Sequence, residues 1–150
     1  MISVKTRKIS SFTNQIPISV GTDGQPFGTN GILYNYRWNS SGGNSSSATQ
    51  NCTGLIPVNA GDTVYLKNCG MGKSDSFRIT AFNSSKTYLS YGQIGNSNFS
   101  NIGSDATFDS DGFLVSFVVK NTGYFTLTSA NSGVQILNEN SICTVNEPIN

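Results

Sequence analysis

The sequence predicts an all-β protein, an antiparallel two-sheet β-sandwich of the jelly-roll type. Three observations support this fold class: short runs that alternate apolar and polar residues, turn residues at short intervals, and no helical apolar period of useful length. Short strands at such spacing are typical of sandwiches, in which each sheet buries one face. A chain of 150 residues fits one such domain and buries roughly 70% of its unfolded surface.

Residues 1–20 are expected to be an N-terminal arm or an edge strand of the sandwich, and the sandwich domain is predicted to span residues 21–150. They alternate weakly and carry basic residues at Lys5, Arg7 and Lys8. Two interpretations remain open, an arm that attaches to a partner and an edge strand with solvated basic side chains. Residues 21–31 consist of turn signals, so no regular element is expected there.

Residues 32–39 are predicted to form one strand with an aromatic face. Ile32, Tyr34, Tyr36 and Trp38 share one face, and Leu33, Asn35, Arg37 and Asn39 share the other. The aromatic face is either a flat platform for sugar rings or ordinary core, and core is favoured because three exposed rings would form an unusually large apolar patch. Arg37, flanked by Asn35 and Asn39, is a second candidate for a polar-ligand site. The candidate glycan-binding residues are therefore Tyr34, Tyr36, Arg37, Trp38 and Asn39.

A strand, a turn and another strand are expected over residues 51–68, after a flexible surface loop at residues 40–47. Pro57 limits pairing at the end of the first strand, and residues 60–62 supply turn chemistry. Val64 and Leu66 then share the face that is expected to enter the core. The segment is predicted to be a hairpin.

The second half of the chain is predicted to be almost entirely strands. Residues 76–91 are expected to form a hairpin that turns at residues 83–86, and residues 92–104 a long loop held to the body by Ile94, Phe99 and Ile102. The further strands are expected at residues 106–108, 113–119, 124–128, 134–137 and 142–145.

Reaction chemistry is not expected, and neither is a cofactor or a metal site. The chain has no histidine, which excludes Ser-His and Cys-His nucleophile systems, and its eight acidic residues fall mostly in turns. The Gly70–Ser74 fragment lacks the spacing of a phosphate loop, and the Asp109–Gly112 turn has too few ligands for calcium. A polysaccharide-degrading enzyme is the less favoured alternative.

The three cysteines, Cys52, Cys69 and Cys143, are expected to be buried reduced thiols. A bridge between Cys52 and Cys69 across the predicted hairpin is the alternative.

The composition argues against several partners. Charged residues are only 11% of the chain and the formal net charge is +1, so the chain is not expected to have the strong positive electrostatic field that attracts nucleic acid. No apolar run is long enough for a membrane span. Basic residues near Met1 are not followed by an apolar run, so we expect no signal peptide and synthesis in the cytoplasm.

Several segments in order resemble a module of bacteriophage tail and other virion proteins. The resemblance extends from about Ile16 to the C-terminus, and its segments are Thr22–Gly24, Tyr36–Gly42, Cys52–Val58 with Ala60–Asp62, Phe82–Leu89 and Thr144–Ile149. Two differences are that Phe82–Asn83 stands where the family often has Tyr-Asp, and that the module is nearly the whole chain.

The resemblance implies a sandwich similar to carbohydrate-binding modules, displayed on the virion surface as part of a tail, baseplate, fibre or capsid decoration. It also implies attachment to other virion proteins, for which we expect the N-terminal segment, and a homo-oligomer, for which a trimer is expected. Host-surface or mucosal glycans are the expected ligands, and a purely architectural module without ligand is the alternative.

Overall fold

The computed structural model describes residues 7–10, 19–20, 25–26, 32–70, 78–108, 114–130, 132, 136–138, 140–146 and 148. Its regular elements are strands apart from one short 3₁₀ helix, η1 (Ser97–Asn101). The all-β prediction is confirmed. No helix in the described part of the chain is long and apolar enough to cross a bilayer.

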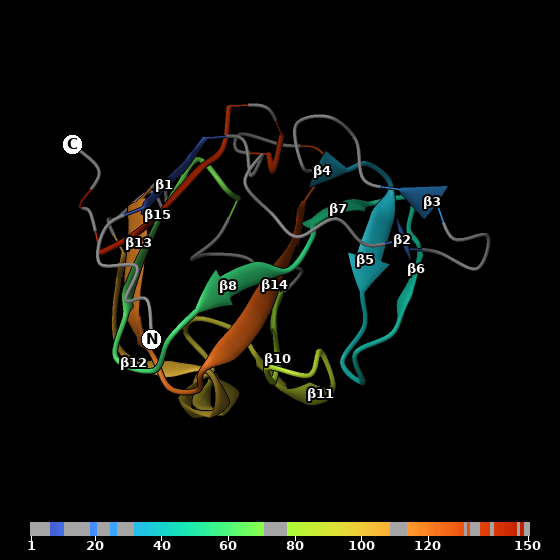
Figure 1. Cartoon of the computed structure of the whole chain (residues 1–150). Coiled ribbons are helices and arrows are strands. Elements are labelled where there is room, and N and C mark those ends of the chain that lie inside the picture. Colours follow the sequence, from blue (N-terminus) through green and yellow to red (C-terminus); the bar gives the residue numbers. More distant parts are fainter. Residues whose placement is uncertain are drawn as a thin grey trace.

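Two antiparallel sheets pack against each other in a sandwich-like arrangement (Figure 1). The first sheet has the order β1 (Arg7–Ser10), β15 (Ile142–Val145), β9 (Thr63–Lys67), β13 (Leu114–Val119) and β12 (Gly103–Phe108). The second sheet has the order β11 (Tyr88–Gly92), β10 (Arg78–Phe82), β14 (Gly123–Ala130), β7 (Gln50–Thr53) and β4 (Ile32–Leu33), and β8 (Ile56–Val58) also pairs with β14. Two further pairs stand apart from these sheets, β2 (Ser19–Val20) with β3 (Gln25–Pro26), and β5 (Tyr36–Trp38) with β6 (Asn44–Ser46).

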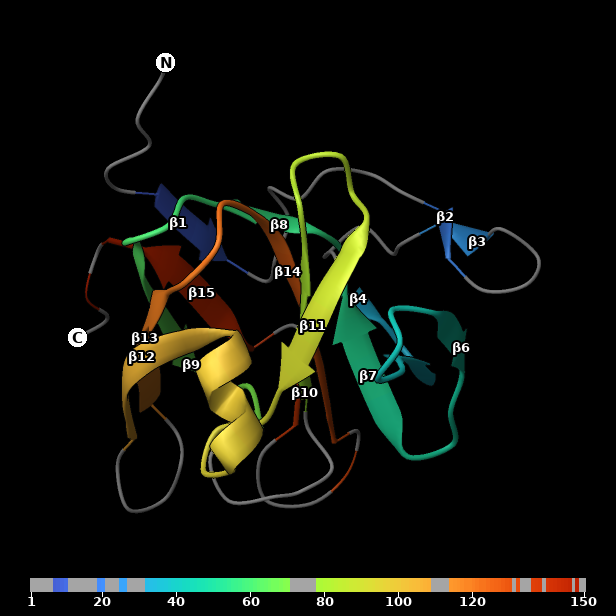
Figure 2. The same ribbon diagram turned by 90° about the horizontal axis from the view of Figure 1, so that it is seen from below.

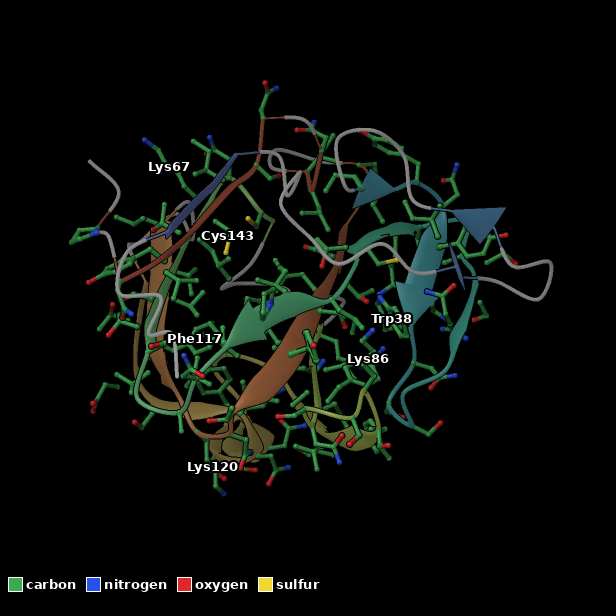
Figure 3. The ribbon with its side chains drawn as sticks, viewed as in Figure 1. Trp38, Lys67, Lys86, Phe117, Lys120 and Cys143 are labelled. Atoms are coloured by element: carbon green, nitrogen blue, oxygen red, sulfur yellow. The ribbon has the colours of Figure 1, made fainter. Side chains whose placement is uncertain are left out.

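The main core lies between the two sheets and is built by alternation along the strands. β13 alternates half-buried and buried residues, and Phe117 from this strand is 1% exposed. Its ring makes edge contacts with Phe99 and Phe125, at centroid distances of 5.3 and 6.3 Å. Val64 and Leu66 enter the same core as predicted. Figure 3 shows Phe117 directed into the space between the sheets.

The turn at residues 59–62 joins the two sheets, so the hairpin predicted over residues 51–68 is wrong. β8 before the turn pairs with β14 of the second sheet, whereas β9 after it pairs with β13 and β15 of the first. The turn itself is as expected: Asp62 Oδ2 accepts a hydrogen bond from Asn59 N at 2.8 Å, and Gly61 has φ +92°. Local turn chemistry makes the chain change direction, but strand pairing is decided by distant segments.

The hairpin predicted over residues 76–91 is confirmed from Arg78 onward. β10 pairs with β11, and Asn83 closes the turn by accepting backbone hydrogen bonds from Ser85 and Thr87 at 2.9 and 3.0 Å. The register places Arg78, Thr80 and Phe82 on the face of the second sheet that points away from the main core, because Ile79 and Ala81 enter that core.

The loop after β11 closes one end of the sandwich, where η1 lies between β11 and β12 (Figure 2). Ile94, Phe99 and Ile102 are buried, which confirms that they hold this loop to the body. The 3₁₀ helix was not predicted because a single short turn leaves no periodic signal.

The structure also bears on several other expected elements, and some of them lie outside the described residues. β12 begins at Gly103, within the predicted loop, and β3 lies within residues 21–31, where no element was expected. Residues 136–137 are not in a strand, although Leu137 is fully buried and its carbonyl accepts a hydrogen bond from Asn51 Nδ2. Of the N-terminal 20 residues, 7–10 form β1 at the edge of the first sheet and 19–20 form β2. The Asp109–Gly112 turn lies outside the described residues, as does the Gly70–Ser74 fragment beyond Gly70.

The three cysteines are buried and free, as predicted. The Cys52–Cys69 bridge is not formed because the two residues do not face each other across a hairpin: Cys52 lies in the second sheet and Cys69 follows β9 of the first. Burial raises the pKa of both the Cys52 and the Cys69 thiol to about 12, so both stay protonated at neutral pH.

Candidate ligand-binding surface

The pair β5–β6, called the ribbon below, covers the outer face of the second sheet. Figure 1 shows it on the side of that sheet opposite the first sheet. The predicted strand over residues 32–39 is interrupted by a turn at Tyr34 and Asn35, and Asn35 has φ +63°. Asparagine tolerates this left-handed conformation better than other residues with a side chain do. The turn moves the chain from β4, in the second sheet, into the ribbon.

The ribbon's own turn is built around Asn39. Its side-chain oxygen accepts hydrogen bonds from Ser41 N, Ser41 Oγ and Gly43 N at 2.9, 2.9 and 3.0 Å. Gly42 occupies a positive φ of 86° in the same turn. Residues 44–46 then pair with β5 as strand β6, so the expectation of a flexible loop over residues 40–47 is wrong. The side chain of Asn39 fixes a conformation that composition alone does not reveal.

Trp38 belongs to a second buried cluster under the ribbon, which we call the ribbon cluster. Its members are Leu33, Trp38, Cys52, Leu55 and Phe82. The Trp38 side chain is 6% exposed, its ring meets Phe82 edge-on at 5.3 Å, and its Nε1 donates to Thr53 O at 2.8 Å. Its backbone N donates to Thr128 Oγ1 of β14 at 3.0 Å. Trp38 therefore has the core role, and a platform that includes its ring does not exist.

Half-exposed tyrosines surround this cluster. Tyr36, Tyr88 and Tyr124 pack against it from β5, β11 and β14. Tyr88 donates its hydroxyl hydrogen to Ser40 O at 2.6 Å, which ties β11 to the turn of the ribbon. Burial, followed by the proximity of Tyr91, raises the pKa of Tyr88. The tyrosine rings are held in place by apolar contact below and remain partly open to solvent.

Arg78 reaches the same surface from β10. Its Nη1 donates to Trp38 O at 3.0 Å, and its guanidinium lies 5.5 Å from the centre of the Tyr91 ring. Burial lowers the pKa of Arg78, and the positive charge of Arg37 lowers it further. Arg37 is exposed on β5, and its Nε donates to Ser45 Oγ at 3.4 Å. Two guanidinium groups from different elements therefore repel each other electrostatically, and that of Arg78 lies beside the Tyr91 ring.

We call the surface made by these residues the tyrosine face, and it consists of Tyr36, Arg37, Arg78, Tyr88, Tyr91 and Tyr124. Of the predicted candidates, Tyr36 packs against the ribbon cluster, and Arg37 is exposed on the opposite face of β5. Tyr34 is 43% exposed in the turn before the ribbon, and Asn39 is engaged in the ribbon's turn.

Sequence reasoning missed Arg78, Tyr88, Tyr91 and Tyr124 as site residues. The available signal was Phe82, a large apolar residue on the otherwise polar face of the predicted strand. A large apolar residue there indicates that something covers that face.

Buried polar atoms without a hydrogen-bond partner concentrate at the same place. In the described part of the chain they are Asn44 Oδ1, Arg78 Nε, Thr80 Oγ1 and Thr126 Oγ1. Thr80 and Thr126 face each other across β10 and β14 and are fully buried. Such groups are few in folded proteins, and a cluster of them calls for an explanation.

Among the described residues, no group of acidic, cysteine or histidine side chains could hold a metal ion. Asp62 stands away from the tyrosine face, in the turn between the sheets, where its Oδ1 accepts from Asn146 Nδ2 at 3.0 Å. The tyrosine face thus offers aromatic rings, hydroxyls and guanidinium groups, which are the kinds of group that contact polar ligands.

Comparisons of this chain with protein-family models, with curated proteins and with solved structures found no match.

Proposed function

We propose that this chain is a non-enzymatic structural protein of a bacteriophage virion that binds host-surface or mucosal glycans through the tyrosine face. The observation that carries the glycan part is the set of half-exposed tyrosine rings seated on the buried ribbon cluster. Rings that are already ordered lose little conformational entropy when a sugar packs against them, so such a surface is suited to weak, shape-selective binding.

The polar neighbours support the same proposal. Sugar hydroxyls need hydrogen-bond donors and acceptors beside the apolar contact. The tyrosine face supplies guanidinium groups from Arg37 and Arg78, and the ribbon turn next to it is rich in Asn and Ser. The virion part of the proposal is supported by the ordered resemblance described above.

The fold part of the proposal is a jelly roll. The order β1-β15-β9-β13 in the first sheet and β7-β14-β10-β11 in the second supports it. The chain passes from β9 in the first sheet to the β10–β11 hairpin in the second, and later from β13 in the first sheet to β14 in the second and back to β15 in the first. These crossings are those of two interlocked Greek keys, with β12 as an added edge strand. In this proposal the N-terminal segment attaches the domain to other virion proteins, and the domain assembles as a homotrimer.

A glycan array followed by titration of the purified chain tests the binding part. We expect binding that Tyr91→Ala weakens about tenfold, since an aromatic contact is removed. Tyr65→Ala is the matched control, because Tyr65 is a half-buried tyrosine on β9 of the first sheet and should leave binding unchanged. Absence of any glycan signal, or equal losses in both variants, would overturn it.

Detection of the chain in purified particles by immunogold labelling tests the virion part, and a mass measurement in solution tests the trimer. A chain that remains free in the lysate while particles lack it would refute the proposed location.

A further inference from the structure

The tyrosine face carries two positive charges that the described residues do not neutralise. Arg37 and Arg78 form no ion pair with a described carboxylate: Asp62 lies in the turn between the sheets, and Asp105 is exposed on β12, at the far edge of the first sheet. Like charges held near one another destabilise a fold unless something offsets their repulsion. A bound anionic group would offset it.

The described residues do not satisfy all the hydrogen-bond donors of the Arg78 guanidinium. Only Nη1 is used, toward Trp38 O, while Nε is buried and has no partner in the described part of the chain. A carboxylate matches a guanidinium edge with two parallel hydrogen bonds, and the edge formed by Nε and Nη2 presents that pattern. If the side chain turns toward solvent, the two oxygens of a ligand carboxylate can accept hydrogen bonds from Nε and Nη2, and Nε then gains the acceptor that it lacks.

Aromatic contact lies directly beside this charge. The Tyr91 ring lies under the Arg78 guanidinium, and Tyr88, at the start of β11, lies on the same face of the second sheet because it pairs with Phe82 as Tyr91 pairs with Thr80. An acidic sugar combines the two features that the surface offers, a C–H face for the rings and a carboxylate for the arginines.

We propose that the tyrosine face selects acidic saccharides, with Arg37 and Arg78 binding the sugar carboxylate beside Tyr91. This inference rests on the proposed glycan-binding function and adds the chemical class of the ligand. Arg78 is the principal contact because its position is fixed by Trp38 and Tyr91, and Arg37 adds a second, more exposed charge.

The test compares 3′-sialyllactose and an oligogalacturonide, each with its own carboxyl methyl ester, by calorimetric or NMR titration. Esterification removes the charge and keeps the ring, so we expect the free acids to bind at least tenfold more tightly than the esters. The difference should shrink as salt is raised. Equal affinity for acid and ester would overturn the inference, and so would tighter binding of a sulfated saccharide than of a carboxylated one.

Charge variants locate the contact. Arg78→Gln and Arg37→Gln should each weaken binding of the acid more than binding of the ester. The loss for the acid should be about tenfold to a hundredfold in Arg78→Gln and smaller in Arg37→Gln. Lys67→Gln is the control, because it removes one positive charge from β9 of the opposite sheet (Figure 3). Loss of acid binding in Lys67→Gln as large as in the arginine variants would overturn the inference. Arg37 is exposed, so its variant stays informative even where Arg78→Gln disturbs folding.

The two proposals fail in different ways. If neutral glycans bind in a Tyr91-dependent manner and acids bind no better, only the preference for acids is wrong. If neither the acids, nor the esters, nor any glycan on the array binds, the glycan-binding function itself fails.

Discussion

Trp38→Ala should destabilise the fold strongly, because Trp38 is buried within the ribbon cluster. Truncation to alanine removes a buried aromatic ring, its contact with Phe82 and its hydrogen bond to Thr53 O. Such truncations cost about 3–5 kcal/mol. Since domains of this size are stable by only about 5–15 kcal/mol, Trp38→Ala should lose a large share of its unfolding free energy.

Trp38→Phe separates the ring contact from the hydrogen bond. Phenylalanine keeps most of the apolar contact and loses the indole donor to Thr53 O, so we expect a cost of about 1–3 kcal/mol. Urea unfolding followed by far-UV circular dichroism measures both variants. Because Trp38 is the single tryptophan, its fluorescence also reports its burial directly in the wild-type chain.

Two results would refute this reasoning. The first is native fluorescence that acrylamide quenches as readily as it does in urea, which would place the indole in solvent. The second is a loss below about 1 kcal/mol in Trp38→Ala, far under the cost of emptying a buried site. Loss of glycan binding in a Trp38→Ala variant that keeps full stability would restore the exposed platform.

Three further predictions concern stability, each measured by chemical denaturation. Thr80→Val should leave the unfolding free energy unchanged or raise it, because the buried Thr80 hydroxyl has no partner among the described residues. Thr128→Val should lower it by about 1–3 kcal/mol, because Trp38 N loses its acceptor. Equal losses in the two variants would show that the Thr80 hydroxyl has a partner. Gly123→Ala should destabilise the fold far more than Gly61→Ala does, although both glycines have a positive φ. Only at Gly123 would an added Cβ meet the backbone of residues 82 and 83. Similar losses in the two variants would contradict this. The raised pKa of Cys52 means that the folded state favours the neutral thiol, so the thiol's contribution to the unfolding free energy is complete below about pH 9 and declines toward pH 12, by about 1.4 kcal/mol per pH unit. Cys52→Ala should remove this contribution to the decline of the unfolding free energy with pH. An unchanged decline in the variant would show that the thiol does not titrate in this way.

Much of the architecture follows from local pattern. The β10–β11 hairpin was predictable because its turn chemistry lies within the hairpin itself, where Asn83 binds the backbone of Ser85 and Thr87. The inward positions of Val64 and Leu66 were predictable because alternation fixes which residues share a face.

What could not be predicted depends on contacts between distant segments. The turn at residues 59–62 has the chemistry of a hairpin, yet β8 and β9 find partners more than forty residues away in β14 and β13. The break at Tyr34 and Asn35 was hidden because Asn35 continues the alternation in the sequence while adopting φ +63° in the structure. The candidate site was predicted in part for the same reason: Tyr36 and Arg37 are local to β5, whereas Arg78 and Tyr91 arrive through pairing of the second sheet.

The position of the unpartnered polar atoms links the stability of the ribbon to its proposed role. Asn44, Arg78, Thr80 and Thr126 all lie under or beside the ribbon, although apolar residues of similar shape would fill the same space without leaving buried polar groups unpaired. Sequences usually break packing rules where function requires it. A ribbon that served only to cover the second sheet would gain from Val at positions 80 and 126. The hydroxyls of Thr80 and Thr126 are covered by protein, so a buried water is the group that would supply their missing hydrogen bonds, whereas Arg78 Nε lies next to the proposed position of the ligand.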